Sequence, residues 1–318
     1  MPYDLSERLV IGIASSALFD LTESDAVFRE QGEEGYRSYQ EEHLDETLKP
    51  GVAFSFVRRL LSLNDLAPAP HDPLVEVIVL SHNDPDTGLR VMRSIQTHEL
   101  PITRAVFMQG KSPYRFMPAL NMSLFLSANQ EDVREAVSAG LPAGSVLGPT
   151  VEDDTSDRDL RISFDFDGIL ADNASEQVYQ SNGIEGFREH EIANAGTAHD
   201  PGPLKDFLAA VNRIQRREEE ERQKDPGYRL RVHVSLVTAR NAPAHERAVM
   251  SLKRWGLRVN DAFFLGGIDK GKIMRILKPH IFFDDQAIHL TSTSRTTPSV
   301  HVPFGQPNEQ APPSLGQS

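Results

Sequence analysis

Two carboxylates stand directly after an apolar segment that has the length of a strand. Residues 160–166 read LRISFDF, and Asp165 and Asp167 are two positions apart, with Gly168 behind them. In extended backbone this spacing puts both side chains on the same side of the chain. One carboxylate can then attack a phosphate ester while its neighbour gives and later takes the proton. An Asp-Gly turn after a strand is the plain structural alternative when the motif is taken alone.

Two further strand-length runs end in residues that suit the same chemistry. Run 230–237 is followed by Thr238, whose hydroxyl could bind a phosphate oxygen or simply cap a helix. Run 262–265 leads into a glycine-rich segment with Lys270, a cation that could screen the nucleophile from the phosphate. Lys272 is a second candidate in that segment, and at least one of the two lysines is expected to be solvated.

A fourth run, 280–283, ends in the adjacent carboxylates Asp284 and Asp285. Adjacent carboxylates after a buried apolar segment are costly unless a cation neutralises them, which indicates an oxygen-ligated Mg²⁺ shared with Asp165. The chain has no cysteine, so any metal must be held by oxygen or imidazole ligands. The four motifs, or signals, at the predicted strand ends together indicate a phosphate-hydrolysing site more specifically than any one of them does.

These runs alternate with segments of helical spacing, such as 203–214 and 244–255. Strands that alternate with helices predict βαβ units, and runs that are apolar on both faces predict a buried parallel sheet. Ligands of such sheets bind at the carboxyl ends of the strands, so the polar residues should meet at one edge. The sequence therefore predicts an α/β fold.

The composition narrows the kinds of partner. The chain has 318 residues, a size that favours two domains, and its net charge of −13 argues against a nucleic-acid partner. Apolar stretch 9–21 follows Asp4 and Glu7, where a signal peptide would carry basic residues, so it is interpreted as a buried strand. No other run approaches the roughly 20 residues of a membrane span. We expect a cytoplasmic protein with no membrane partner.

The two halves of the chain resemble each other. An offset of 151 residues pairs Gly32 with Gly183, and an offset of 157 pairs Arg90 with Arg247. Chance likeness is the alternative, because glycine and proline favour the same junctions in any α/β unit. We interpret the likeness as an internal duplication that produces two similar parallel-sheet domains.

The predicted domains are an α/β domain at 1–147, a linker at 148–159, a catalytic domain at 160–305 and a disordered tail at 306–318. The first copy is predicted to be degenerate and non-catalytic, because it lacks every acid and the lysine of the four signals and keeps only the hydroxyl. In the first copy, Ala14 matches Asp165, Ser16 matches Asp167 and Ser81 matches Thr238. Likewise, Pro113 matches Lys270, Ser127 matches Asp284 and Ala128 matches Asp285.

The order of the four signals resembles the four motifs of the haloacid dehalogenase superfamily. More closely, FDFDGILAD, LGGIDKGKI, IFFDDQAIH and HVPFG are similar to segments of the cytosolic type I 5'-nucleotidase family. The resemblance extends into the first half through SSALFDLTESDAVF, GYRSYQEEH, SHNDPDTGLRV and SPYRFMPALNMSLFLSANQEDV. It therefore spans nearly the whole chain, to about residue 305.

The resemblance implies a role for each residue of the four signals. Asp165 would be the nucleophile and Asp167 the acid and base, with Thr238 and Lys270 on the phosphate. Mg²⁺ would be held by Asp165, the backbone carbonyl of Asp167 and Asp284, with Asp285 binding directly or through water. The implied reaction is hydrolysis of nucleoside 5'-monophosphates, such as AMP, through an aspartyl-phosphate.

Two other functions stay open at this point. One is a phosphatase of the same type that acts on other small phosphomonoesters, and the other is a nucleotide-binding regulatory module without turnover. Polar residues of the first copy, among them Tyr36 and Asn83, could form a site for a nucleotide effector or simply cap helices. The oligomeric state is open, a homo-oligomer included.

Overall fold

The computed structural model describes residues 3–151, 154 and 156–305. The predicted tail at 306–318 lies outside the described residues. Contacts within the chain divide it into two units, Met1–Arg158 and Asp159–Ser318. Each unit is an α/β domain built on parallel strands, as the alternation of strand and helix patterns predicted.

The described part of the first unit holds five strands in the order β3-β2-β1-β4-β5. Neighbouring strands run parallel. Strands β1 and β2 are buried along their whole length, as expected of a parallel sheet covered on both faces. The strands are β1 (Leu9–Ile13), β2 (Val75–Ser81), β3 (Arg104–Phe107), β4 (Leu124–Ser127) and β5 (Ala143–Leu147). The helices are α1 (Ser15–Leu18), α2 (Thr22–Glu42), α3 (Phe54–Ser62), α4 (Gly88–Thr97) and α5 (Gln130–Ser138), with short 3₁₀ turns η1 (Leu63–Leu66) and η2 (Pro113–Phe116).

In the described part of the second unit, five strands follow the order β10-β9-β6-β7-β8, again in parallel pairs. Phe164, Phe207 and Phe283 pack together within it, with ring centroids 5.2 to 6.0 Å apart. The strands are β6 (Leu160–Phe164), β7 (Val232–Thr238), β8 (Asp261–Phe264), β9 (Ile281–Asp284) and β10 (Ser299–His301). The helices are α6 (Ala174–Ala193), α7 (Lys205–Lys224), α8 (His245–Arg254), α9 (Lys270–Leu277) and α10 (Ala287–Thr293).

The element bounds of the two units follow the two offsets found in the sequence. An offset of 151 carries the bounds of β1 onto those of β6, and an offset of 157 carries β2, α4, β3 and β4 onto β7, α8, β8 and β9. The two strand orders also correspond under these offsets. The two halves therefore share their topology, strand by strand.

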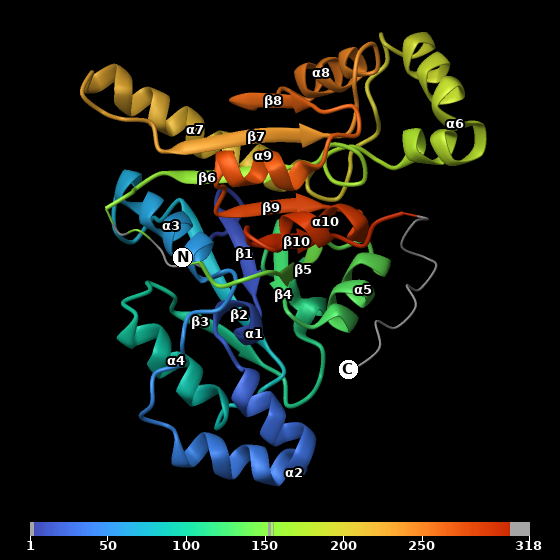
Figure 1. The fold of residues 1–318 in the computed structure, drawn as a ribbon. Coiled ribbons are helices and arrows are strands. Elements are labelled where there is room, and N and C mark those ends of the chain that lie inside the picture. The colour runs from blue at the N-terminus through green and yellow to red at the C-terminus, as the bar shows by residue number, and fades with distance from the viewer. Residues whose placement is uncertain (1–2, 152–153, 155, 306–318) are drawn as a thin grey trace. The chain divides into compact units, whose positions relative to one another are not determined.

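Helices α2 and α6 are each bent at a glycine. Gly32 has a φ of 70° and Gly183 a φ of 67°, so both leave the helical conformation inside otherwise continuous helices. Figure 1 shows each of these helices as two segments that meet at an angle. A positive φ is easy only for glycine, which explains why the same residue type stands at both bends.

The charged run 216–227 predicts a solvated helix end and loop, and helix α7 does end within it, at Lys224. Helix α7 extends through most of it, and Glu218 is buried. This carboxylate accepts hydrogen bonds from the backbone N–H groups of Arg231 and Val232, at the start of β7. Within the described residues, no helix is both long enough and apolar enough to cross a membrane.

Candidate active site

The polar residues singled out in the sequence lie at the carboxyl ends of neighbouring strands of the second unit. Asp165 directly follows β6, and Thr238 and Asp284 are the last residues of β7 and β9. Lys270 begins α9, after β8. Because β6 pairs in parallel with both β7 and β9, these strand ends share one edge of the sheet. Parallel α/β sheets bind their ligands at such an edge.

Lys270 lies at the centre of a buried ion-pair cluster. Its Nζ is 2.7 Å from Asp165 Oδ2 and 2.7 Å from Asp284 Oδ2. Only 3% of Lys270 is exposed, whereas Lys272, the other candidate of the glycine-rich segment, is exposed. The side chain of Asp269 accepts a backbone N–H of the first turn, which fixes the start of α9 at Lys270.

Burial and crowding of charge shift the pKa values of this cluster. Burial and the neighbouring Asp284 raise the pKa of Asp165 to about 6, although Lys270 opposes the shift. Burial also acts to raise the pKa of Asp284, but Lys270 and His289 outweigh it and lower that pKa. The pKa of Asp285 is raised well above its usual value by burial and by Asp284. Three carboxyl groups are therefore crowded near one ammonium group, and an added cation would relieve their mutual repulsion.

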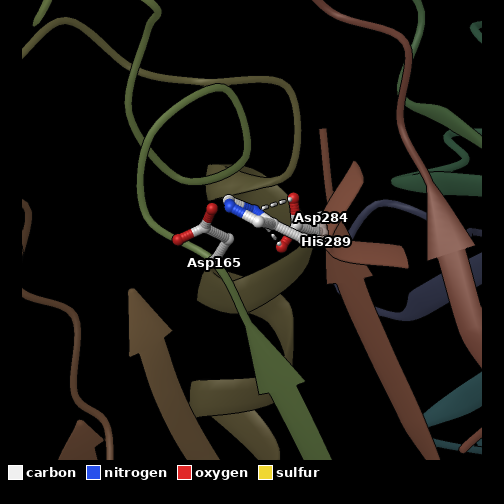
Figure 2. A group of neighbouring side chains, drawn as sticks. All are labelled: Asp165, Asp284 and His289. Atoms are coloured by element: carbon white, nitrogen blue, oxygen red, sulfur yellow. Dashed lines mark hydrogen bonds and ion pairs between the residues drawn. The ribbon is translucent and has the colours of Figure 1, made fainter. Parts of the chain in front are cut away.

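Asp165, Asp284 and His289 form a group that could hold a metal ion. One ligand atom of each lies within 4.8 Å of those of the others. Figure 2 shows the three side chains gathered at the strand ends. His289 Nδ1 lies 3.2 Å from both oxygens of Asp284. His289 was not among the residues predicted from the sequence, although it lies in the motif IFFDDQAIH, five residues after Asp284.

The surroundings of Asp285 fit a hard cation as well. Its Oδ1 is buried and has no hydrogen-bond partner among the described residues. Gly168 packs directly against it, since a Cβ at that position would lie 2.5 Å from Asp285 Cγ. An unpartnered buried carboxylate oxygen is costly in an apolar surrounding, and carboxylate oxygens are the ligands that Mg²⁺ prefers.

Asp167 does not join the lysine cluster but pairs with Arg240. The guanidinium of Arg240 donates from Nε to Asp167 Oδ2 over 2.7 Å and from Nη2 to Asp167 Oδ1 over 2.6 Å. The backbone N–H of Arg240 also donates to Thr238 Oγ1 over 3.3 Å. Arg240 thus contacts two of the residues predicted from the sequence, although no role was predicted for Arg240 itself.

A buried network extends from Arg240 to Glu191, near the end of α6. Glu191 accepts from Arg240, from Arg247 over 2.8 Å and from Ser175 over 2.7 Å. Burial alone would raise the pKa of Glu191, but His199 and Arg240 outweigh it and hold that pKa far below its usual value. The sequence contains one weak indication of this network: when the two halves are aligned at an offset of 157, an arginine stands at the same place in both, Arg90 and Arg247.

Fold and site together define an α/β protein with an acidic strand-end site. Buried carboxylates surround one lysine, and a second carboxylate is paired with an arginine beside them. This is a donor set that suits a hard cation and a phosphate group.

Comparison with known proteins gives the family. Residues 1–309 match the family model described as 5'-nucleotidase. Human cytosolic 5'-nucleotidase 1B is 31% identical over 294 residues, which cover 90% of this chain and 47% of the human protein. No solved structure matches. The chain belongs to the 5'-nucleotidase family, so the resemblance to its cytosolic type I branch is confirmed. The chain spans about half the length of this curated relative.

Proposed function

We propose that the chain is a Mg²⁺-dependent 5'-nucleotidase that hydrolyses nucleoside 5'-monophosphates to nucleoside and phosphate. The observation that carries this proposal is the buried contact of Lys270 with both Asp165 and Asp284. This contact places the carboxylate of Asp165 beside the buried ammonium group of Lys270, at the sheet edge where α/β proteins bind ligands. Membership of the 5'-nucleotidase family supports the choice of substrate.

In the proposed cycle, an oxygen of Asp165 attacks phosphorus while the bond to the nucleoside 5'-oxygen breaks. Asp167 gives that oxygen its proton, which leaves an aspartyl-phosphate on Asp165. Asp167 then takes a proton from water, the water oxygen attacks phosphorus, and the bond to Asp165 breaks. Lys270 and the Thr238 hydroxyl bind the phosphate oxygens and compensate their charge.

The proposed Mg²⁺ ligands are Asp165, the backbone carbonyl of Asp167 and Asp284, with Asp285 binding directly or through water. The unpartnered Asp285 oxygen and the excess of carboxylates support this assignment. When bound, the ion would supply charge compensation for the phosphate oxygens. His289 is a further candidate ligand, because its ring lies within reach of the same ion as Asp165 and Asp284.

We also propose that the two units arose by duplication and that the second is the catalytic one. The matching element bounds and the bends at Gly32 and Gly183 support the duplication. The replacement of Asp165 by Ala14 and of Lys270 by Pro113 supports an inert first unit. A cytoplasmic location is supported by the cytosolic relative. A nucleotide effector and a homo-oligomer remain predictions.

The direct test is phosphate release from purified protein. AMP, GMP, CMP, UMP and their deoxy forms would be compared with glucose 6-phosphate and glycerol phosphate, each with Mg²⁺ and with EDTA. We expect Mg²⁺-dependent release that favours nucleoside monophosphates. Equal rates on all phosphomonoesters would assign a broader phosphatase. Saturable AMP binding without release, in the presence of Mg²⁺, would assign a regulatory module instead.

A further inference from the structure

We infer that Arg240 is a positioning residue that orients the Asp167 carboxylate and links its orientation to helix α6. The inference rests on the proposed function, in which Asp167 gives the leaving oxygen its proton. It adds to that function a group which does not touch the substrate but decides whether Asp167 points at it.

The first observation is the geometry of the pair. Both oxygens of Asp167 accept from Arg240, through Nε at 2.7 Å and Nη2 at 2.6 Å. A planar guanidinium that binds both oxygens fixes the plane of a carboxylate as well as its position. Asp167 therefore cannot rotate independently of Arg240.

The second observation is that Arg240 is itself held on every side. Its Nη1 donates to Glu191 and, over 3.2 Å, to the carbonyl of Ala244. The rings of Phe166 and Phe187 lie against the guanidinium, with centroids 5.1 Å and 5.4 Å from Cζ. Only 4% of Arg240 is exposed, so it has no solvent-facing position to move into.

The third observation is that two of the supports of Arg240, Phe187 and Glu191, come from α6. Phe187 and Glu191 are one turn apart in the segment after the bend at Gly183. Ser175, in the segment before the bend, donates to Glu191 over 2.7 Å. Both segments of α6 thus converge on the carboxylate that holds Arg240, and a change in the bend would displace Arg240 and Asp167 with it.

The first unit shows that the scaffold does not need Arg240. There, Gln40 takes the place of Glu191, and its Oε1 accepts from Arg90 Nη1 over 3.2 Å, as Glu191 accepts from Arg247. The matching position for Arg240 is Asn83, and the matching position for Asp167 is Ser16. Both units therefore have a contact between the bent helix and an arginine, Gln40 with Arg90 and Glu191 with Arg247. Arg240, in contrast, is present only in the unit that has Asp167.

An oriented proton donor matters only for a leaving group that needs the proton. The 5'-oxygen of a nucleoside is an alkoxide unless it is protonated as it leaves. The oxygen of p-nitrophenol leaves readily as an anion. Loss of the orientation of Asp167 should therefore slow AMP hydrolysis far more than hydrolysis of p-nitrophenyl phosphate.

The test measures kcat and KM on AMP and on p-nitrophenyl phosphate for Arg240→Gln, Arg240→Lys and the unchanged protein. We expect Arg240→Gln to lower kcat on AMP by about 10²-fold, and kcat on p-nitrophenyl phosphate by less than about 10-fold. KM for AMP should stay within about threefold, since no substrate contact is removed. Arg240→Lys should recover part of the loss, because the charge returns without the two-pronged geometry.

Arg247→Gln is the matched control. It removes another buried arginine from Glu191, but Arg247 makes no contact with Asp167 in the described structure. Its ratio of kcat values on the two substrates should change much less than that of Arg240→Gln, because Glu191 still accepts from Arg240 and Ser175. An equal loss on both substrates in Arg240→Gln, or the same change of ratio in Arg247→Gln, would show that Arg240 has a structural role only and would overturn the inference.

If Arg240→Gln does not fold, Glu191→Gln replaces it, because Gln40 shows that an amide is accepted at the matching place. It should change the substrate ratio in the same direction and to a smaller extent, and an unchanged ratio would again overturn the inference. Unchanged protein that hydrolyses neither substrate would refute the proposed function itself, a result distinct from either of these.

Discussion

The ammonium group of Lys270 lies 2.7 Å from Asp165 Oδ2, within the buried part of the second unit. An ion pair in that position costs desolvation of both partners, which their attraction repays only if the geometry is good. Asp284 adds a second carboxylate at the same distance. Two carboxylates therefore share one lysine, so removal of Lys270 leaves both acids without it, whereas removal of one acid leaves a single ion pair.

Asp165→Asn should abolish turnover while the protein remains folded. The amide keeps the shape of the side chain, but it cannot attack phosphorus, so kcat should fall by about 10³-fold or more. Phosphate release from AMP and a thermal melt check this expectation. Asp206→Asn is the control, since that side chain is 83% exposed and its loss should change neither quantity. Robust hydrolysis by Asp165→Asn would refute its role as nucleophile.

Lys270→Met should destabilise the protein when no divalent ion is present. It leaves Asp165, Asp284 and Asp285 buried without a cation, a loss of about 3–5 kcal/mol for a broken buried pair. Added Mg²⁺ should then raise the Tm of the variant by more than it raises that of the unchanged protein. Lys272→Met is the control, because Lys272 is exposed. An equal Mg²⁺ response in all three proteins would contradict the proposed metal site.

Gly168→Ala should impair activity beyond its effect on stability. Gly168 has a φ of 69°, and an added Cβ would lie 2.5 Å from Asp285 Cγ, so the carboxylate must move. Gly256→Ala is a matched control: its φ is 68°, and a Cβ there meets nothing within 4 Å. Both variants should lose about 1–2 kcal/mol from backbone strain. Only Gly168→Ala should also need more Mg²⁺ for half-maximal activity. If both variants needed the same Mg²⁺ concentration, Asp285 would have no role in binding the ion.

Glu191→Gln should be less stable than the unchanged protein at pH 7, and this difference should shrink in acid. The pKa of Glu191 is lowered on folding, so its stabilising effect is complete above its usual pKa of 4.5 and is lost as the pH falls below that value. Melting curves from pH 7 to pH 3 measure the difference in Tm. A difference that stayed constant over this range would mean that the Glu191 charge contributes nothing.

Much of the fold could be predicted from the sequence because it is encoded in local patterns. Predicted strands at 160–166, 230–237, 262–265 and 280–283 correspond to β6, β7, β8 and β9, with ends that differ by two residues or fewer. Apolar runs of that length leave few alternatives once helical segments separate them. The burial of Glu218 was missed, because this residue belongs to the charged run 216–227, which was interpreted as solvated.

The residues around Lys270 could be proposed from the sequence because each lies at the end of a strand or directly after it. Arg240 and Glu191 could not, because 49 residues and the bend of α6 separate the two partners. A buried arginine and a buried glutamate look like surface residues until the chain brings them together. His289 was missed for another reason, since its place in the first turn of α10 gives no sign of which way the ring points.

The contact of Gln40 with Arg90 sets an order in which a site could be built on the first unit. Asn83 Nδ2 is buried, so Asn83→Arg alone would place a guanidinium near the neutral amide of Gln40 without an acid to compensate its charge. Gln40→Glu alone would already have Arg90 as its partner. A path that rebuilds the site in the first unit would therefore favour the acid before the arginine, because the acid finds its partner already in place.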